Sequence, residues 1–102
     1  MKKLKTITEI LNILKNNEKY LKKKHRFKSI GVFGSYLNGN VREDSDLDIL
    51  IEFQKDAKIG LIKYINIEEE LSKLFGIEVD LVEKSALKPK IGEHVLKEIV
   101  YP

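Results

Sequence analysis

The sequence contains no cysteine and no tryptophan, and only two of its 102 residues are proline. Without cysteine, disulfide bonds and thiolate metal sites are excluded, so any metal must be held by oxygen ligands or by the two histidines. Long hydrophobic runs are also missing, because no apolar segment approaches the roughly 20 residues of a transmembrane helix. A chain without cysteine fits a reducing compartment, and we expect a soluble cytoplasmic protein.

The length fits one domain with a modest core and leaves no room for a second domain that holds a substrate. We therefore expect a single domain over residues 1–102. The net charge is +3, and much of the positive charge falls in residues 19–28 and 84–97. Such runs usually form solvated faces, but a contact with RNA, a triphosphate or an acidic partner stays open.

Hydrophobic periodicity divides the chain in the order helix, strand, turn, strand, helix, strand, helix. The expected strands are short and rich in β-branched residues, at 27–33, 47–53 and 77–82. The expected helices have capping signals, which are Thr6 and Glu9 for 7–23, Gly76 for 61–75 and Pro89 for the last helix. This order predicts an α/β or α+β domain, with a small mixed sheet flanked by helices.

Two carboxylates stand at the head of the second expected strand. Because side chains alternate along a strand, Asp46 and Asp48 point the same way, about 7 Å apart, while Leu47 points into the core. Asp80 interrupts an otherwise apolar third strand, and it reaches the other two if this strand pairs beside the second. Three crowded carboxylates favour a cation that relieves their repulsion. Mg²⁺ fits because it prefers oxygen ligands and keeps positions for water and phosphates, and Asp80 could accept a proton from the attacking group.

A glycine and a serine follow the first expected strand. Gly34 lets a phosphate approach the backbone, and the amides that follow it form a corner that suits an anion. Ser35 adds a hydroxyl donor. The strand order places this corner and the carboxylates at the edge of two neighbouring strands, where the intervening loop can fold over a triphosphate.

Two known motifs, one for calcium and one for phosphate, are excluded because residues that they require are missing. Residues 44–48 open like an EF-hand calcium loop, but Ile49 replaces its glycine and Lys55 its glutamate. Gly34 and Gly39 have the spacing of a P-loop, but the lysine that must follow is missing. A solvated turn at 44–48 remains the structural alternative.

Several other side chains are expected to have only structural roles. Glu68 is expected as a charge at the edge of its helix, and Tyr36 as a packing residue at the base of the loop. His25 and His94 lack the spacing of metal ligands, so we expect both at the surface. The apolar contacts expected for the last helix are Val95, Leu96, Ile99 and Val100.

Residues 34–50 begin with Gly34-Ser35 and contain Ser45-Asp46-Leu47-Asp48. This segment resembles the signature of the minimal nucleotidyltransferases of the DNA polymerase β-like superfamily. The run Val79-Asp80-Leu81-Val82 matches the strand that carries the third carboxylate in that family. The resemblance covers nearly the whole chain and implies the nucleotidyltransferase fold, with ATP as substrate and two Mg²⁺ ions. It implies that Gly34 and Ser35 hold the triphosphate, that Asp46 and Asp48 bind both ions, and that Asp80 completes the site.

Family members of this length are typically antitoxins of HEPN/MNT pairs, which place AMP on a tyrosine of a HEPN-domain ribonuclease. The resemblance therefore implies a HEPN-domain toxin as partner, while the lack of a long apolar run predicts no membrane partner. The family usually has arginine where this sequence has Asn38, and Arg42 is the candidate replacement in nucleotide binding. Two alternatives stay open. The protein could transfer a nucleotide to RNA or to a small molecule, or it could be a module that neutralises its partner by covering it without catalysis.

Overall fold

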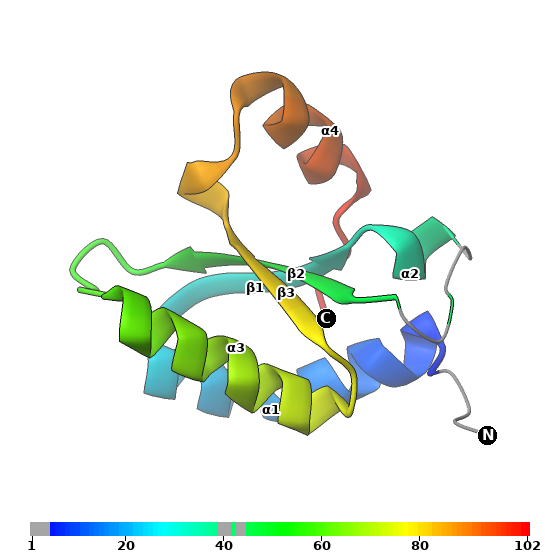
Figure 1. The fold of residues 1–102 in the computed structure, drawn as a ribbon, viewed down its shortest axis with the longest axis horizontal. Coiled ribbons are helices and arrows are strands. Elements are labelled where there is room, and N and C mark those ends of the chain that lie inside the picture. The colour runs from blue at the N-terminus through cyan, green and yellow to red at the C-terminus, as the bar shows by residue number, and fades with distance from the viewer. Residues whose placement is uncertain (1–4, 39–41, 43–44) are drawn as a thin grey trace.

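The computed structural model describes residues 5–38, 42 and 45–102, and its centre is a three-stranded sheet (Figure 1). The strands follow the order β1 (Phe27–Phe33), β2 (Leu47–Phe53) and β3 (Val79–Glu83). β1 and β2 are antiparallel, whereas β2 and β3 are parallel and are joined through a helix. The predicted mixed sheet flanked by helices is therefore confirmed.

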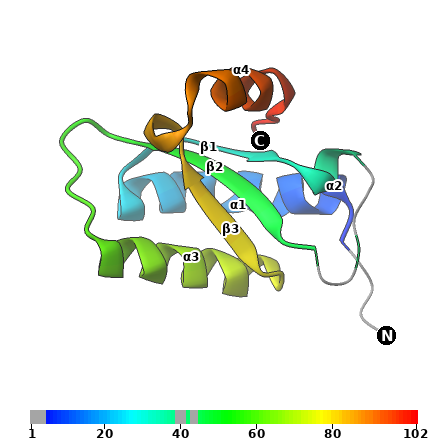
Figure 2. The same cartoon turned by 45° about the horizontal axis from the view of Figure 1, so that its top comes forward.

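Two helices, α1 (Ile7–His25) and α3 (Leu61–Phe75), cover the same face of the sheet (Figure 2). The capping box predicted for α1 is present, because Thr6 Oγ1 accepts a hydrogen bond from Glu9 N and Glu9 Oε1 accepts one from Thr6 N. Such a cap contributes about 1 kcal/mol. α1 ends two residues beyond the expected residue 23, where Arg26 adopts a left-handed conformation with φ 59°.

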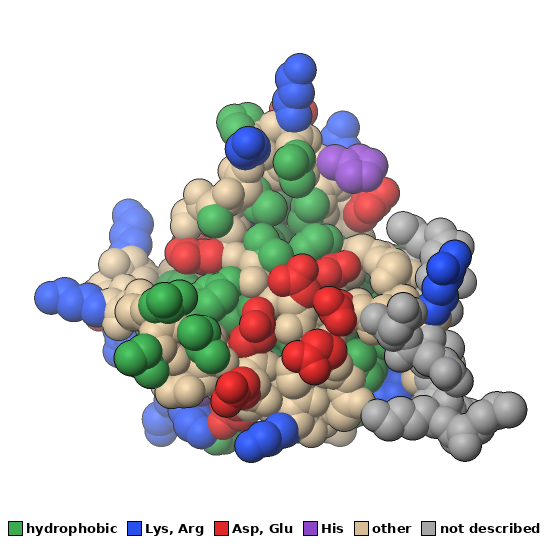
Figure 3. Space-filling view, viewed as in Figure 1, with side chains coloured by type: hydrophobic (Ala, Val, Ile, Leu, Met, Phe, Trp, Pro, Cys, Tyr) green, Lys and Arg blue, Asp and Glu red, His purple; other side chains and the backbone are tan. Residues whose placement is uncertain are grey.

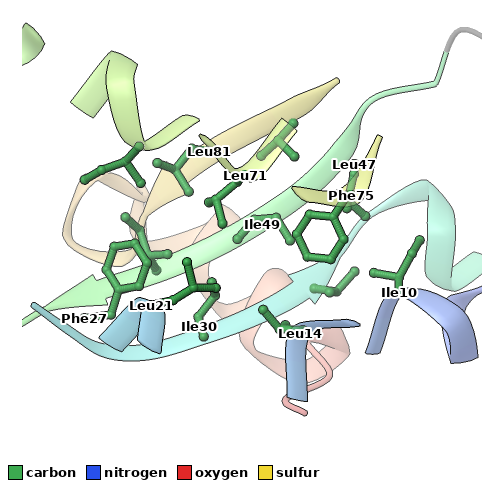
Figure 4. Close-up of a cluster of buried hydrophobic side chains, with 14 of the residues drawn as sticks. Ile10, Leu14, Leu21, Phe27, Ile30, Leu47, Ile49, Leu71, Phe75 and Leu81 are labelled. Carbon is green, nitrogen blue, oxygen red and sulfur yellow. The ribbon is translucent and has the colours of Figure 1, made fainter. Parts of the chain in front are cut away.

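The main hydrophobic core lies between these two helices and the sheet (Figure 4). Leu47, Ile49 and Ile51 alternate along β2 and are completely buried, as the period of a strand requires. Each such side chain contributes about 1.5–3 kcal/mol by its burial. The labelled partners in Figure 4 come from α1, α3 and the other two strands, and are Ile10, Leu14, Leu21, Phe27, Ile30, Leu71, Phe75 and Leu81.

The other face of the sheet meets η1 (Lys84–Ala86), α4 (Pro89–Glu98) and the C-terminal segment. Our expectation that Ile99 and Val100 belong to the contacts of the last helix is wrong. The helix ends at Glu98, and Val100 instead pairs with Val32 of β1 through two backbone hydrogen bonds of 2.9 Å. Leu96, another expected contact, is 43% exposed, whereas Val95 is buried as expected.

Both ends of the third strand differ from the sequence prediction, since β3 runs from Val79 to Glu83 rather than over 77–82. β3 begins at Val79 rather than at residue 77, because the end of α3 uses the residues before it. Gly76 adopts φ 67°, and the amides of Gly76 and Ile77 both donate to the carbonyl of Ser72. This capping turn keeps Ile77 out of the sheet.

No helix within the described ranges is both long and apolar enough to cross a membrane.

Candidate active site

Asp48 and Asp80 lie side by side on the face of the sheet opposite α1 and α3. They are direct partners in the register of β2 and β3. Their neighbours Leu47, Ile49 and Leu81 are buried in the core on the other face, so the alternation of both strands directs the two carboxylates away from it. Figure 3 shows acidic side chains gathered on this side of the molecule. The second and third strands pair as the sequence analysis required, and this pairing places Asp80 beside Asp48.

Burial and charge crowding act together on Asp48. Burial, followed by the negative charges of Asp80 and Asp46 and a hydrogen bond with the Asp80 carboxyl, raises the pKa of Asp48 to about 6. Asp48 is half-buried, whereas Asp80 is exposed. The site therefore holds one carboxylate against the backbone and a second one open to solvent, and a cation would relieve their repulsion.

Gly34 is in direct contact with the Asp48 carboxylate. A Cβ atom at Gly34 would lie only 2.0 Å from Asp48 Oδ2 and 2.9 Å from Asp48 Cγ. The backbone of Gly34 has φ 85°, a conformation that glycine adopts at little cost. The register explains the contact, because Phe33, the residue before Gly34, is the partner of Asp48. The predicted phosphate corner and the carboxylates therefore meet at Gly34.

Ser35 and Tyr36 follow in the short helix α2 (Ser35–Asn38). Ser35 is half-buried, and the amide of Leu37 donates to the carbonyl of Gly34 at 3.0 Å, which closes the turn. Tyr36 is buried, as expected for a packing residue, and burial followed by the charge of Asp46 raises its pKa. This turn fixes the direction in which the chain leaves β1.

Asp46 and Arg42 lie before β2, outside regular secondary structure, and both are exposed. Ser45 links the segment, because its hydroxyl accepts from Arg42 N at 2.8 Å and its amide donates to the Arg42 carbonyl at 3.0 Å. The charge of Asp46 reaches Asp48, but within residues 5–38, 42 and 45–102 no three acidic or histidine side chains form a metal-type group. Gly39, together with residues 43–44, lies outside the described residues.

The donor set nonetheless fits Mg²⁺ in kind. Asp48 and Asp80 present neighbouring carboxylate oxygens on an open face, which is the ligand type that this ion prefers. Burial and the neighbouring negative charges raise the pKa of Asp48, and a bound divalent cation would remove the repulsion between the carboxylates. Asp46 is the third carboxylate within electrostatic range.

The structure corrects the roles expected for two other side chains. His25 is 7% exposed rather than at the surface, and its Nε2 contacts the carboxylate of Glu70, whereas His94 is exposed as expected. The position of His25 four residues after the buried Leu21 is the sequence signal that places it on the inner face of α1. Glu68 is half-buried and accepts a hydrogen bond from Leu81 N at 3.0 Å, so it is not a free charge at the helix edge.

The basic stretch at residues 19–28 is largely paired with acidic side chains. Its members in ion pairs with glutamate or aspartate are Lys22, Lys24, Arg26 and Lys28. Exposed pairs of this kind contribute little to stability. The pairing agrees with the expected solvated face.

Comparison with known proteins gives a consistent result. Residues 14–102 match the family model for the nucleotidyltransferase domain. The protein adenylyltransferase MntA of Thermococcus cleftensis is 47% identical over 96 residues, which cover 94% of this chain and 95% of that protein. A solved structure described as a minimal nucleotidyltransferase matches with a TM-score of 0.72 at 33% identity, over 90% of this chain and 95% of that one.

A further structural likeness is to a complex of tri-AMPylated Shewanella oneidensis HEPN toxin with its MNT antitoxin. The TM-score is 0.64 at 18% identity, and the match covers 89% of this chain and 70% of that chain. At this identity the likeness shows a shared fold.

Proposed function

Since the chain belongs to the nucleotidyltransferase family and is an enzyme of that class, we propose that it transfers AMP from ATP to a tyrosine of a HEPN-domain toxin. In this role it is the antitoxin of the pair. The observation that carries the proposal is the contact of Asp48 with both Asp80 and Gly34, which joins a carboxylate pair to a backbone corner. A relative named protein adenylyltransferase, and a neighbour that is an MNT antitoxin bound to an AMPylated HEPN toxin, support AMP transfer to a protein.

Each site residue has a defined part in this proposal. Gly34 and Ser35 receive the triphosphate through the backbone amides of the turn that follows β1 and through the Ser35 hydroxyl. Arg42, which is exposed, contributes positive charge toward the nucleotide. Asp46, Asp48 and Asp80 would hold Mg²⁺, which supplies charge neutralisation at the phosphates and activation of the attacking oxygen.

The transfer is an in-line substitution at the α-phosphorus of ATP. The tyrosine oxygen forms a bond with this phosphorus, while the bond from the phosphorus to the oxygen that bridges toward the β-phosphorus breaks. Pyrophosphate leaves with that electron pair. The phenolic proton passes to the Asp80 carboxylate, which is exposed and therefore accessible to an incoming side chain.

The test is incubation of the purified protein with ATP, Mg²⁺ and the product of the adjacent gene, which the proposal expects to be a HEPN-domain protein, followed by intact mass spectrometry of both chains. We expect AMP on the partner with the parent protein, and no AMP with Asp46→Asn or Asp48→Asn. Asp56→Asn is the matched control, since Asp56 is an exposed carboxylate that pairs with Arg26 outside the site. This control should transfer AMP at the parent rate.

The transfer reaction, together with an assay of protection against the toxin, distinguishes the alternatives. A stable complex without transfer, together with equal protection against the toxin by the parent and by Asp48→Asn, would contradict the enzymatic role and favour neutralisation by covering. AMP appearing on RNA or on a small molecule, with none on the protein partner, would contradict the proposed acceptor.

A further inference from the structure

β3 is the outer strand of the described sheet, so one side of its backbone has no neighbouring strand. Unpaired amide and carbonyl groups along such an edge need other partners. Three side chains of α3 provide them. Ser72 Oγ accepts from Val79 N at 2.9 Å, Glu68 Oε2 accepts from Leu81 N at 3.0 Å, and the Tyr64 hydroxyl donates to the Leu81 carbonyl.

The spacing of Glu68 and Ser72 matches the strand, because these residues are four apart on α3 and accept from the amides of Leu81 and Val79, which are two apart on β3. Every fourth residue of a helix advances about 6.0 Å, and every second residue of a strand about 6.6 Å, so the two repeats stay nearly in step. Tyr64, Glu68 and Ser72 are four apart, and they form what we name the α3 polar ladder. Ser72 Oγ also donates to the carbonyl of Glu68 at 2.9 Å, which joins the ladder to the helix backbone.

We propose that Glu68 is a positioning residue that holds Asp80 beside Asp48 through the backbone of β3. Asp80 lies between the two residues that the ladder holds, and its carboxylate is exposed, so its location depends on the strand that carries it. The inference rests on the proposed function, because it assigns Asp80 to the carboxylate pair used there.

Tyr64 supports the same arrangement from the next turn of α3. Burial, followed by the charges of Glu68, Glu83 and Asp80, raises the pKa of Tyr64 to about 12. Its hydroxyl therefore keeps its proton near neutral pH and remains a donor to the Leu81 carbonyl. Both polar groups of the Leu81 backbone are in this way satisfied by the ladder.

The experiment measures Mn²⁺ affinity by electron paramagnetic resonance, and exchange of the Leu81 amide by NMR, in the full chain without ATP or partner. Glu68→Ala should weaken Mn²⁺ binding about tenfold, the lower end for loss of a residue that orients a metal ligand. It should also accelerate exchange of the Leu81 amide. Glu68→Gln keeps an oxygen acceptor and should restore both values nearly to those of the parent.

Glu69→Ala is the matched control, because Glu69 is an exposed carboxylate on the same helix and loses the same charge. It should leave both values unchanged.

If Glu68→Ala does not fold, Tyr64→Phe tests the ladder at the Leu81 carbonyl and should also weaken Mn²⁺ binding. Unchanged Mn²⁺ affinity in the folded ladder variants, while the parent transfers AMP, would overturn the positioning role alone. A parent that binds Mn²⁺ tightly but transfers no AMP would contradict the proposed function and leave the positioning role to be decided by the variants.

Discussion

The contact between Gly34 and Asp48 makes a quantitative prediction for Gly34→Ala. Two separate costs apply at this position. The backbone has φ 85°, where a residue with a Cβ atom loses about 1–2 kcal/mol. The new Cβ would also lie 2.0 Å from Asp48 Oδ2, so the carboxylate must move.

Two other glycines separate these costs. Gly76 has φ 67° and, apart from Lys5 Nζ at 3.5 Å, open space around a Cβ, so Gly76→Ala should cost the backbone term alone, about 1–2 kcal/mol. Gly60 has φ −83° with nothing within 4 Å, and Gly60→Ala should change stability by at most about 1 kcal/mol. Gly34→Ala should cost about 2–5 kcal/mol, because forcing an atom into a packed site adds about 1–3 kcal/mol.

Urea unfolding of the three variants without Mg²⁺ measures this order, and a double-mutant cycle identifies its cause. Asp48→Ala removes the carboxylate that the new Cβ would meet. In that background the cost of Gly34→Ala should fall close to that of Gly76→Ala, because only an approach of 3.1 Å to the Cβ atom of residue 48 remains. AMP transfer by Gly34→Ala should fall by at least as much as by Asp48→Asn. Additive free energies in the cycle, or equal costs for the Gly34 and Gly76 variants, would refute the contact.

Two further predictions concern stability away from the carboxylate pair. Burial alone would raise the pKa of Glu70, but hydrogen bonds from Lys24 and His25 outweigh it and hold this pKa below its ordinary 4.5. Below about pH 4.5 the unfolded chain therefore binds more protons at Glu70 than the folded chain does. The stability that Glu70 contributes is present above that pH and is lost as the pH falls through the pKa of Glu70 in the folded state. Thermal unfolding between about pH 7 and 3 should show a smaller acid loss for Glu70→Gln than for the parent, and equal slopes would exclude this role. Gly31→Val should displace Ile99, because Ile99 Cδ1 lies 2.7 Å from the position of a Cβ at Gly31, and it should lower stability by about 1–3 kcal/mol. Amide exchange measured by NMR should then accelerate in the segment that pairs with β1. An unchanged exchange rate would contradict this packing.

The strands could be predicted from the sequence almost residue by residue, because each apolar run is short and ends at a clear signal. β1 and β2 have the bounds expected from their β-branched runs. The errors arise where backbone hydrogen bonds override composition. Ile77 is apolar and β-branched, but the cap of α3 takes its amide, and Val100 looks helical by spacing but pairs with Val32.

The placement of Asp80 beside Asp48 could be predicted from the sequence, but the contact of Asp48 with Gly34 could not. The alternation of β2 gives the direction of Asp48, and parallel pairing gives its neighbour Asp80. The position of Gly34 against the Asp48 carboxylate depends on a positive φ and on the register of β1, which no local pattern contains. His25 was missed for a related reason, since its partner Glu70 lies on another helix and is 45 residues away in sequence.

The two faces of one sheet divide stability from chemistry. Leu47, Ile49 and Leu81 face the core, and the burial of these side chains holds β2 and β3 in the register that places the carboxylates together. On the opposite face burial and the charges of Asp80 and Asp46 raise the pKa of Asp48, so keeping this carboxylate ionised opposes folding. Because neighbouring strand residues point to opposite faces, the core holds the crowded pair in place, and under the proposed function a bound cation would relieve the repulsion without movement of the strands.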